Sequence, residues 1–223
     1  MGDASACGGN GGRPFDPACA RCPRLADHLA TIRRTYPDYH ARPVPAYGSA
    51  QSALLVVGLA PGLHGANATG RPFTGDDSGK LLFRVLHRFG FSSAPEAHGA
   101  ALINCRVTNA VRCLPPGNRP AAAEIRNCNA YLLWELGELP AGGVVLALGH
   151  VAHEAVVRAE RLRRRELPFF HGAEHSLQRG RVLLDSYHCS RYNTQTGRLT
   201  EAMLETVAQR ARGIVDPMGR ARR

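Results

Sequence analysis

Four cysteines have the residue type and spacing that metal chemistry requires. They form one close pair and one wider pair: Cys19 with Cys22, and Cys113 with Cys128. Four convergent thiolates suit a zinc ion or an iron–sulfur cluster. The alternative is a redox-active C-x-x-C pair and two unrelated core cysteines. Because the two pairs lie far apart in the chain, a shared metal site requires the fold to bring two distant segments to one point.

A second set of candidate residues falls in loops that follow predicted strands. Phe73 and Asp76 lie in a Gly-rich loop, Asn109 ends the next strand, and His188 follows the last strand. Ligands of open parallel sheets bind at the carboxyl ends of the strands, so one cleft is expected to gather these side chains. The carboxylate can orient or activate water, and the phenyl ring can stack on a base. The amide can read the edge of a pyrimidine, and a neutral histidine can donate to an oxygen that gains negative charge.

Each of these residues also has a purely structural interpretation. Asp76 fits a helix N-cap, and Phe73 fits a plug in a small core. Asn109 fits a buried turn, and His188 fits a structural histidine. Five other histidines have weaker claims to a role: His64, His150, His153, His171 and His175.

The glycines of the first loop suit a phosphate-binding loop. However, the chain contains neither a G-x-x-x-x-G-K-[ST] pattern nor a proper G-x-G-x-x-G pattern. Binding of a nucleoside triphosphate therefore has weak support.

Charge and composition restrict the class of partner. The 223 residues include 28 Lys and Arg against 18 Asp and Glu, which gives a formal charge of +10. This surplus favours a polyanion such as nucleic acid. A GC-rich genome that encodes basic residues as Arg is the alternative, since Lys80 is the only lysine. No signal peptide or membrane span is expected, so the cysteines should meet a reducing cytoplasm that favours metal over disulfide.

Apolar runs alternate with amphipathic stretches along the chain. Strands are expected at residues 53–59, 100–109, 143–148 and 181–187. Helices are expected at residues 20–40, 80–89, 121–139, 151–165 and 197–213, the last with Thr200 as its N-cap. This alternation predicts a three-layer α/β/α domain with a mainly parallel sheet. Residues 1–17 are expected to be a disordered leader, residues 18–213 the domain, and residues 214–223 a basic tail in which Pro217 and Gly219 prevent a helix.

Four motifs, in this order, resemble the family 5 (type B) uracil-DNA glycosylases. They are GLAPG at 58–62, GRPFTGD at 70–76, TNAVRC at 108–113 and YHCSRYNTQTGRLT at 187–200. The similarity runs from residue 19 to residue 213. It implies a central four-stranded parallel sheet and hydrolysis of the N-glycosidic bond of uracil, hydroxymethyluracil, ethenocytosine or hypoxanthine. The expected substrate is double-stranded and also single-stranded DNA, and the expected enzyme is a nucleoid-associated monomer without membrane contact.

The same resemblance implies roles for individual residues. The apolar Ala60 marks family 5, so the water-positioning role passes to Asp76. Phe73 stacks on the base, Asn109 reads its edge, and His188 donates to the uracil O2. The first motif is expected to border the substrate through Gly58, Ala60, Pro61 and Gly62.

Two further elements follow from the resemblance. The loop at 190–197, with Ser190 and Asn193, enters the DNA at the flipped base. One departure lies beside it, because many superfamily members have HPS where this chain has His188, Cys189 and Ser190. A [4Fe-4S] cluster, with zinc as the alternative, is expected on Cys19, Cys22, Cys113 and Cys128.

Two rival functions remain open at this stage. One is a non-catalytic, metal-stapled module that holds DNA without cutting it, and release of uracil from oligonucleotides would exclude it. The other is a nucleotide-binding or phosphate-transfer enzyme on a similar sheet. The missing P-loop lysine argues against the latter.

Overall fold

A six-stranded sheet forms the centre of the computed structural model, which describes residues 12–220. The strand order is β1-β3-β2-β4-β6-β5. The four inner strands are parallel: β2 (Leu54–Gly58), β3 (Cys105–Asn109), β4 (Val144–Leu148) and β6 (Val182–Ser186). The predicted four-stranded parallel core is confirmed.

The two edge strands were not predicted. β1 (Tyr47–Gly48) pairs antiparallel with β3, and β5 (Glu174–Ser176) pairs antiparallel with β6. At two and three residues, they are too short to display an alternating hydrophobic pattern. Their pairing depends on the neighbouring strand that is already in place.

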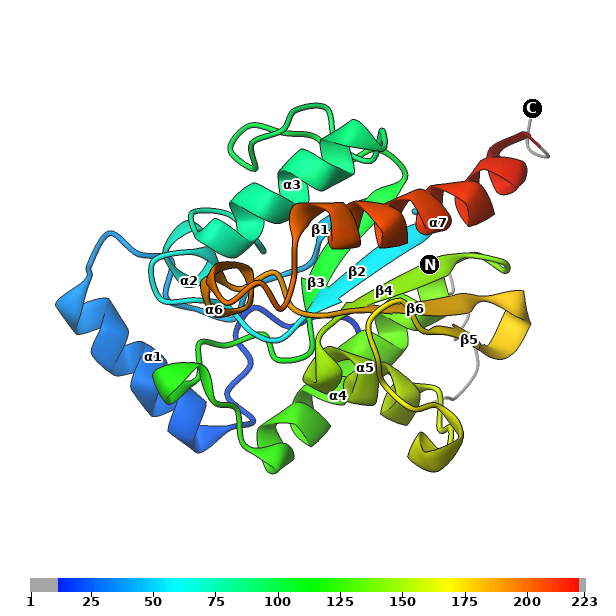
Figure 1. The fold of residues 1–223 in the computed structure, drawn as a ribbon. Helices are drawn as coiled ribbons and strands as arrows, with labels where there is room; N and C mark the ends of the chain where they lie inside the picture. Colours follow the sequence, from blue (N-terminus) through cyan, green and yellow to red (C-terminus); the bar gives the residue numbers. More distant parts are fainter. Residues whose placement is uncertain (1–11, 221–223) are drawn as a thin grey trace, which may run out of the picture.

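Helices cover both faces of the sheet, as predicted (Figure 1). On one face pack α3 (Asp77–Arg88) and α7 (Glu201–Arg220), and on the other pack α4 (Ala122–Glu138) and α5 (His150–Ala159). Successive residues of a strand point to opposite faces. Accordingly, Leu54 and Val56 enter the α3/α7 core, while Leu55 and Val57 enter the α4/α5 core.

The inner strands all end on one side of the molecule. The short helices α2 (Ala66–Thr69) and α6 (Arg191–Gln195) follow β2 and β6 and lie beyond that end of the sheet (Figure 1). Helix α1 (Pro23–Thr35) lies beyond the same end. Short 3-10 turns occur at Pro116–Asn118, Arg164–Glu166 and Gln178–Gly180. Within residues 12–220, no helix has the length and apolar character needed to cross a membrane.

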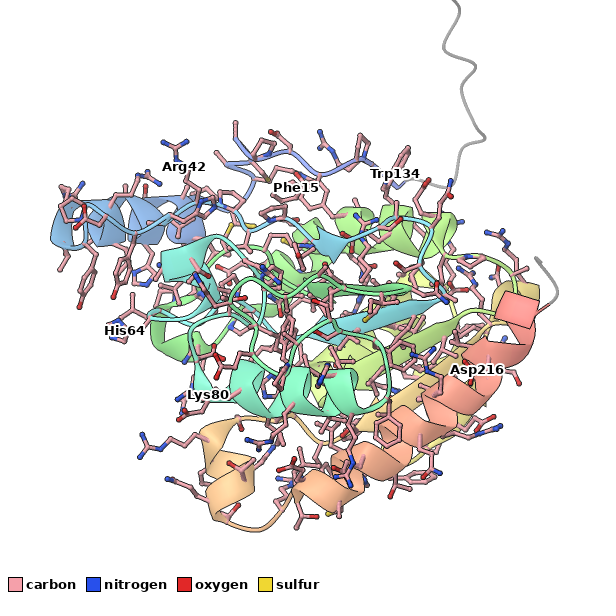
Figure 2. All side chains as sticks on the ribbon, turned by 90° about the horizontal axis from the view of Figure 1, so that it is seen from above. Phe15, Arg42, His64, Lys80, Trp134 and Asp216 are labelled. Atoms are coloured by element: carbon pink, nitrogen blue, oxygen red, sulfur yellow. The ribbon has the colours of Figure 1, made fainter. Side chains whose placement is uncertain are left out.

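Residues 12–17 are packed against α4, which corrects the prediction that they belong to a disordered leader. The Arg13 N–H donates to the Ala130 carbonyl at 3.1 Å, and the Phe15 ring meets the Tyr131 ring edge-on at 5.6 Å. Figure 2 shows Phe15 and Trp134 along the same edge of the molecule. The contact between Phe15 and Tyr131 and the hydrogen bond of Arg13 thus order a segment whose composition favours disorder. The remaining leader residues, 1–11, lie outside the described part of the chain.

Three helices end elsewhere than predicted. Helix α1 ends at Thr35, before Pro37, rather than at residue 40. Helix α7 continues past residue 213 through Pro217 to Arg220, because Val215 is 1% exposed and belongs to the α3/α7 core. The predicted tail therefore begins as helix, and residues 221–223 lie outside the described part. Helix α5 ends at Ala159 rather than at residue 165, since Arg161 has a left-handed φ of 57°. The predicted cap of α7 is confirmed, because Thr200 Oγ1 accepts from the Met203 N–H at 3.2 Å.

Candidate active site

A pocket of about 180 Å³ opens at the carboxyl ends of the inner strands. The loops after β2 and β6 and the end of β3 contribute its walls. The structure therefore brings together seven of the residues that the sequence singled out: Ala60, Gly62, Phe73, Asp76, Asn109, His188 and Ser190.

The other three predicted residues support the pocket without lining it. Gly58 ends β2, and a Cβ atom there would lie 2.5 Å from both Asn109 Oδ1 and Phe73 Cζ. Only a glycine lets those two side chains meet at this point. Pro61 is buried, and Asn193 Nδ2 donates to the backbone carbonyl of His188 at 2.8 Å.

Asp76 is both a helix cap and a pocket residue. Its Oδ1 accepts from the Gly79 N–H at 2.9 Å and so caps α3. Its Oδ2 faces the loop after β2, where a Cβ atom on Gly65 would lie only 2.4 Å away. Burial raises the pKa of Asp76 above its ordinary value, and the hydrogen bond from Gly79 partly opposes this effect. A carboxylate with a raised pKa is a stronger proton acceptor, so the structural and catalytic interpretations are compatible.

Phe73 also combines two interpretations. Its side chain is 6% exposed and belongs to the α3/α7 core, yet it borders the pocket. Its φ of 53° is rare for a bulky residue. The tight loop is possible because residue 79 is glycine: a Cβ atom there would lie 1.9 Å from the Phe73 carbonyl oxygen. The ring is therefore held rigidly, as a stacking surface must be.

His188 follows β6 and lines the pocket. Its Nδ1 is buried and has no hydrogen-bond partner among the described residues. Burial lowers the pKa of His188 to about 4, so the imidazole is neutral near pH 7. A neutral ring carries one N–H, which leaves Nε2–H as the donor for a ligand when Nδ1 is the bare nitrogen.

Ser190 and Asn193 fix the loop that follows His188. Ser190 Oγ accepts from the Asn193 N–H at 3.5 Å and caps the short helix α6. Together with the Asn193 bond to His188, this turn fixes the backbone on both sides of Cys189, which is 1% exposed.

Sequence reasoning missed four lining residues: Leu59, Ala66, Ser78 and Asn118. Asn118 ends the 3-10 turn after β3 with a φ of 56°. The P-P-G-N sequence at 115–118 signals a turn, but it does not indicate that the turn folds back over the pocket. Ser78 follows Asp76 in the same loop and could have been named with it.

The four predicted metal-ligating cysteines lie together beside α1. Cys22, Cys113 and Cys128 contact the same small core as α1. Burial, followed by the nearby thiols of Cys128, Cys19 and Cys22, raises the pKa of Cys113 to about 12. No disulfide joins the cysteines of residues 12–220. Clustered thiols that are hard to ionise fit a site for a positively charged metal group, which would stabilise the thiolates.

Known proteins resemble this chain over most of its length. The Uracil DNA glycosylase superfamily matches residues 45–212. The type-5 uracil-DNA glycosylase of Thermus thermophilus is 46% identical over 205 residues, which cover 88% of this chain and 94% of that protein. The type-5 uracil-DNA glycosylase of Mycobacterium leprae is 44% identical over 209 residues, which cover 88% and 91%. The type-4 uracil-DNA glycosylase of Pyrobaculum aerophilum is 34% identical over 130 residues, which cover 56% and 60%. The chain therefore belongs to the uracil-DNA glycosylase superfamily and to its type-5 group.

Proposed function

We propose that this protein is a DNA repair enzyme that hydrolyses the N-glycosidic bond of uracil and related damaged bases. One observation carries the proposal: a carboxylate, a neutral histidine, an aromatic ring and an amide converge on one small pocket. Its volume of about 180 Å³ lies below the roughly 300–1,000 Å³ of sites for drug-sized ligands. That size suits one planar base rather than a whole nucleotide.

The base has to leave the duplex before the pocket can receive it. Extrusion of a nucleotide costs a few kcal/mol, and less at a mispair. Within the pocket, Phe73 would stack against the base and Asn109 would read its edge. As the glycosidic bond lengthens, the base gains negative charge and the sugar gains positive charge. The Nε2–H of His188 would stabilise the base, and Asp76 would hold water against C1′ of the sugar.

The exposed surface beside the pocket supports binding of DNA. Arg191 and Tyr192 begin α6 directly after the pocket residue Ser190, and Tyr192 is 72% exposed. The formal charge of +10 suits phosphate contacts, which predict weaker binding as salt rises. We propose that this loop enters double-stranded DNA at the flipped base, that the enzyme acts on the nucleoid as a monomer, and that single strands are also accepted.

We further propose that Cys19, Cys22, Cys113 and Cys128 hold a [4Fe-4S] cluster. In the described part of the chain, no three of the cysteine sulfurs lie within 4.8 Å of one another. A single zinc ion with Zn–S bonds of about 2.3 Å would hold its sulfurs roughly 3.8 Å apart. The wider spacing favours the larger iron–sulfur group. When bound, the cluster would act structurally and tie the chain before α1 to the segment after β3, through Cys113, and to α4, through Cys128.

The cluster proposal is tested on protein purified without oxygen. We expect iron and sulfide in equal amounts and a broad visible absorbance, with both lost in Cys128→Ser. Stoichiometric zinc without visible absorbance would show that the site holds a single ion.

The catalytic proposal is tested with the pair Asp76→Asn and Asp77→Asn. Asparagine caps helices as well as aspartate does, so Asp76→Asn should preserve α3. We expect its single-turnover release of uracil from a G·U duplex to fall by at least ~100-fold, within the range for removal of a catalytic acid or base. Binding to a duplex with an abasic site should change little. The exposed Asp77, which pairs with Lys80 at 3.0 Å, serves as the matched control. Equal rates in both variants would remove Asp76 from catalysis.

A further inference from the structure

A second group of potential metal ligands lies away from the pocket and the cysteines. It comprises His153 of α5, His175 of β5 and Asp185 of β6, with one ligand atom from each within 4.8 Å of the others. The side chains are 4%, 9% and 0% exposed, respectively. Neither the predicted active site nor the predicted cluster uses them.

The orientation of His153 leaves a lone pair facing a carboxylate. Its Nε2 lies 2.9 Å from the carbonyl oxygen of Leu167, which only an N–H can satisfy. A neutral imidazole then has a bare Nδ1, and this atom lies 2.9 Å from Asp185 Oδ1, within hydrogen-bond distance, and 2.8 Å from Asp185 Oδ2. Two lone-pair groups repel at this distance, so a cation, either a proton or a metal ion, has to lie between them.

The surroundings of His175 distinguish a metal ion from a proton at this position. Its Nε2 lies 3.3 Å from Asp185 Oδ2, yet both atoms are buried without a hydrogen-bond partner in the described residues. A proton shared between His153 and Asp185 leaves this third donor unsatisfied, which is costly for a buried group. Metal–ligand bonds of about 2.1 Å at a tetrahedral angle place neighbouring ligand atoms roughly 3.4 Å apart. The contact between His175 and Asp185 has that length.

We propose that His153 Nδ1, His175 Nε2 and Asp185 bind one divalent transition-metal ion, with zinc as the matching ion. Imidazole and carboxylate ligands suit zinc. The Leu167 carbonyl holds the ring of His153 in place, as outer contacts of metal-bound histidines do. The Phe169 ring, 5.6 Å from the His153 ring, keeps water away, and the partly exposed His175 marks the route of entry. Tetrahedral binding requires that His153 Nδ1 and Asp185 Oδ2 separate by about 0.6 Å from their present 2.8 Å, and that the two histidine nitrogens, which lie within 4.8 Å of each other, take the same spacing.

The ion would fasten the edge of the sheet. β5 has three residues and pairs only with β6 among the described strands, while α5 packs against the adjacent β4 and shares an apolar cluster with Leu183 of β6. An ion held by one residue from each element would lock them together. It would also stiffen β6 three residues before His188.

The test measures zinc on the intact protein with its cysteine site filled. Wild type, His175→Gln and the nearby control His171→Gln are dialysed against zinc and washed, and their zinc and iron contents are measured. His175 lies on an edge strand, so its replacement should leave the fold intact, which circular dichroism verifies. We expect one zinc per chain in wild type and His171→Gln, and at least tenfold less retained zinc in His175→Gln, with equal iron in all three.

X-ray absorption at the zinc edge identifies the ligands. The proposal requires nitrogen and oxygen neighbours without sulfur. Zinc bound through sulfur, zinc content unaffected by His175→Gln, or no zinc retained would each overturn the proposal. The group would then be a buried histidine–aspartate ion pair that shares a proton.

Discussion

Acidification from about pH 7.5 to about pH 5 should leave His188 neutral, although an ordinary histidine would become charged across this range. Burial lowers the pKa of His188 from 6.5 to about 4. At pH 5, a group with a pKa of about 4 is roughly nine-tenths neutral, whereas an unperturbed histidine is only about 3% neutral. The shift corresponds to about 3–4 kcal/mol at roughly 1.4 kcal/mol for each pH unit.

The same shift has a defined effect on stability. The unfolded chain binds a proton at an ordinary histidine pKa, whereas the folded chain does not bind it until about pH 4. The free energy of unfolding is therefore unaffected by protonation of His188 above about pH 6.5. It decreases as the pH falls from about 6.5 to about 4, with about 2 kcal/mol lost at pH 5. His188→Gln should show a smaller loss of stability between pH 7.5 and pH 5 by roughly this amount.

Nuclear magnetic resonance of the histidine rings measures the midpoint directly. The His188 signal is assigned by its absence in His188→Gln, and the exposed His98 serves as the internal reference. Iron content is monitored at each pH so that loss of the cysteine-bound group is not mistaken for titration. A His188 midpoint between pH 6 and pH 7 would refute the argument, because the ring would then be solvated and charged in acid.

Two further predictions concern the shape of the site. Gly58→Ala places a Cβ atom 2.5 Å from Asn109 Oδ1 and Phe73 Cζ, so overpacking of about 1–3 kcal/mol should lower kcat/KM roughly ten- to a hundredfold. The control Gly137→Ala adds a Cβ atom with no neighbour within 4 Å and should leave kcat/KM unchanged; equal rates in the two variants would mean that the pocket tolerates the extra atom. Tyr192→Ala should weaken binding to a uracil-containing duplex by about tenfold in fluorescence anisotropy, since a stacked aromatic ring contributes about 1–3 kcal/mol. Tyr192→Phe should bind normally, and unchanged affinity in the alanine variant would contradict insertion of this residue into DNA.

Residue patterns alone predicted the inner sheet and most of the pocket. Strands β2 and β4 are short apolar runs, β6 begins as one, and β3 is irregular but bounded; each is followed by a break in the pattern, so the alternation of strands and helices could be read directly. Once the strands are parallel, their carboxyl ends share one edge of the sheet, which brings Asp76, Asn109 and His188 together without further information. The motifs then associated these positions with a reaction.

Other features depended on contacts between segments that are distant in sequence. Residues 12–17 are ordered by the meeting of Phe15 with Tyr131, and α7 is extended by the burial of Val215. Neither contact leaves a trace in local composition. The same holds for Asn118, which reaches the pocket only because its turn folds back.

The ionisation of the site was likewise decided by the tertiary structure. Sequence identifies a histidine and an aspartate, but burial determines that the pKa of His188 falls and that of Asp76 rises. The group of His153, His175 and Asp185 shows the same limit, because in the sequence the two histidines had only weak claims to a role and Asp185 was not singled out. They form a candidate site only where α5, β5 and β6 converge, since a metal recognises the distances between ligand atoms and not their order in the chain.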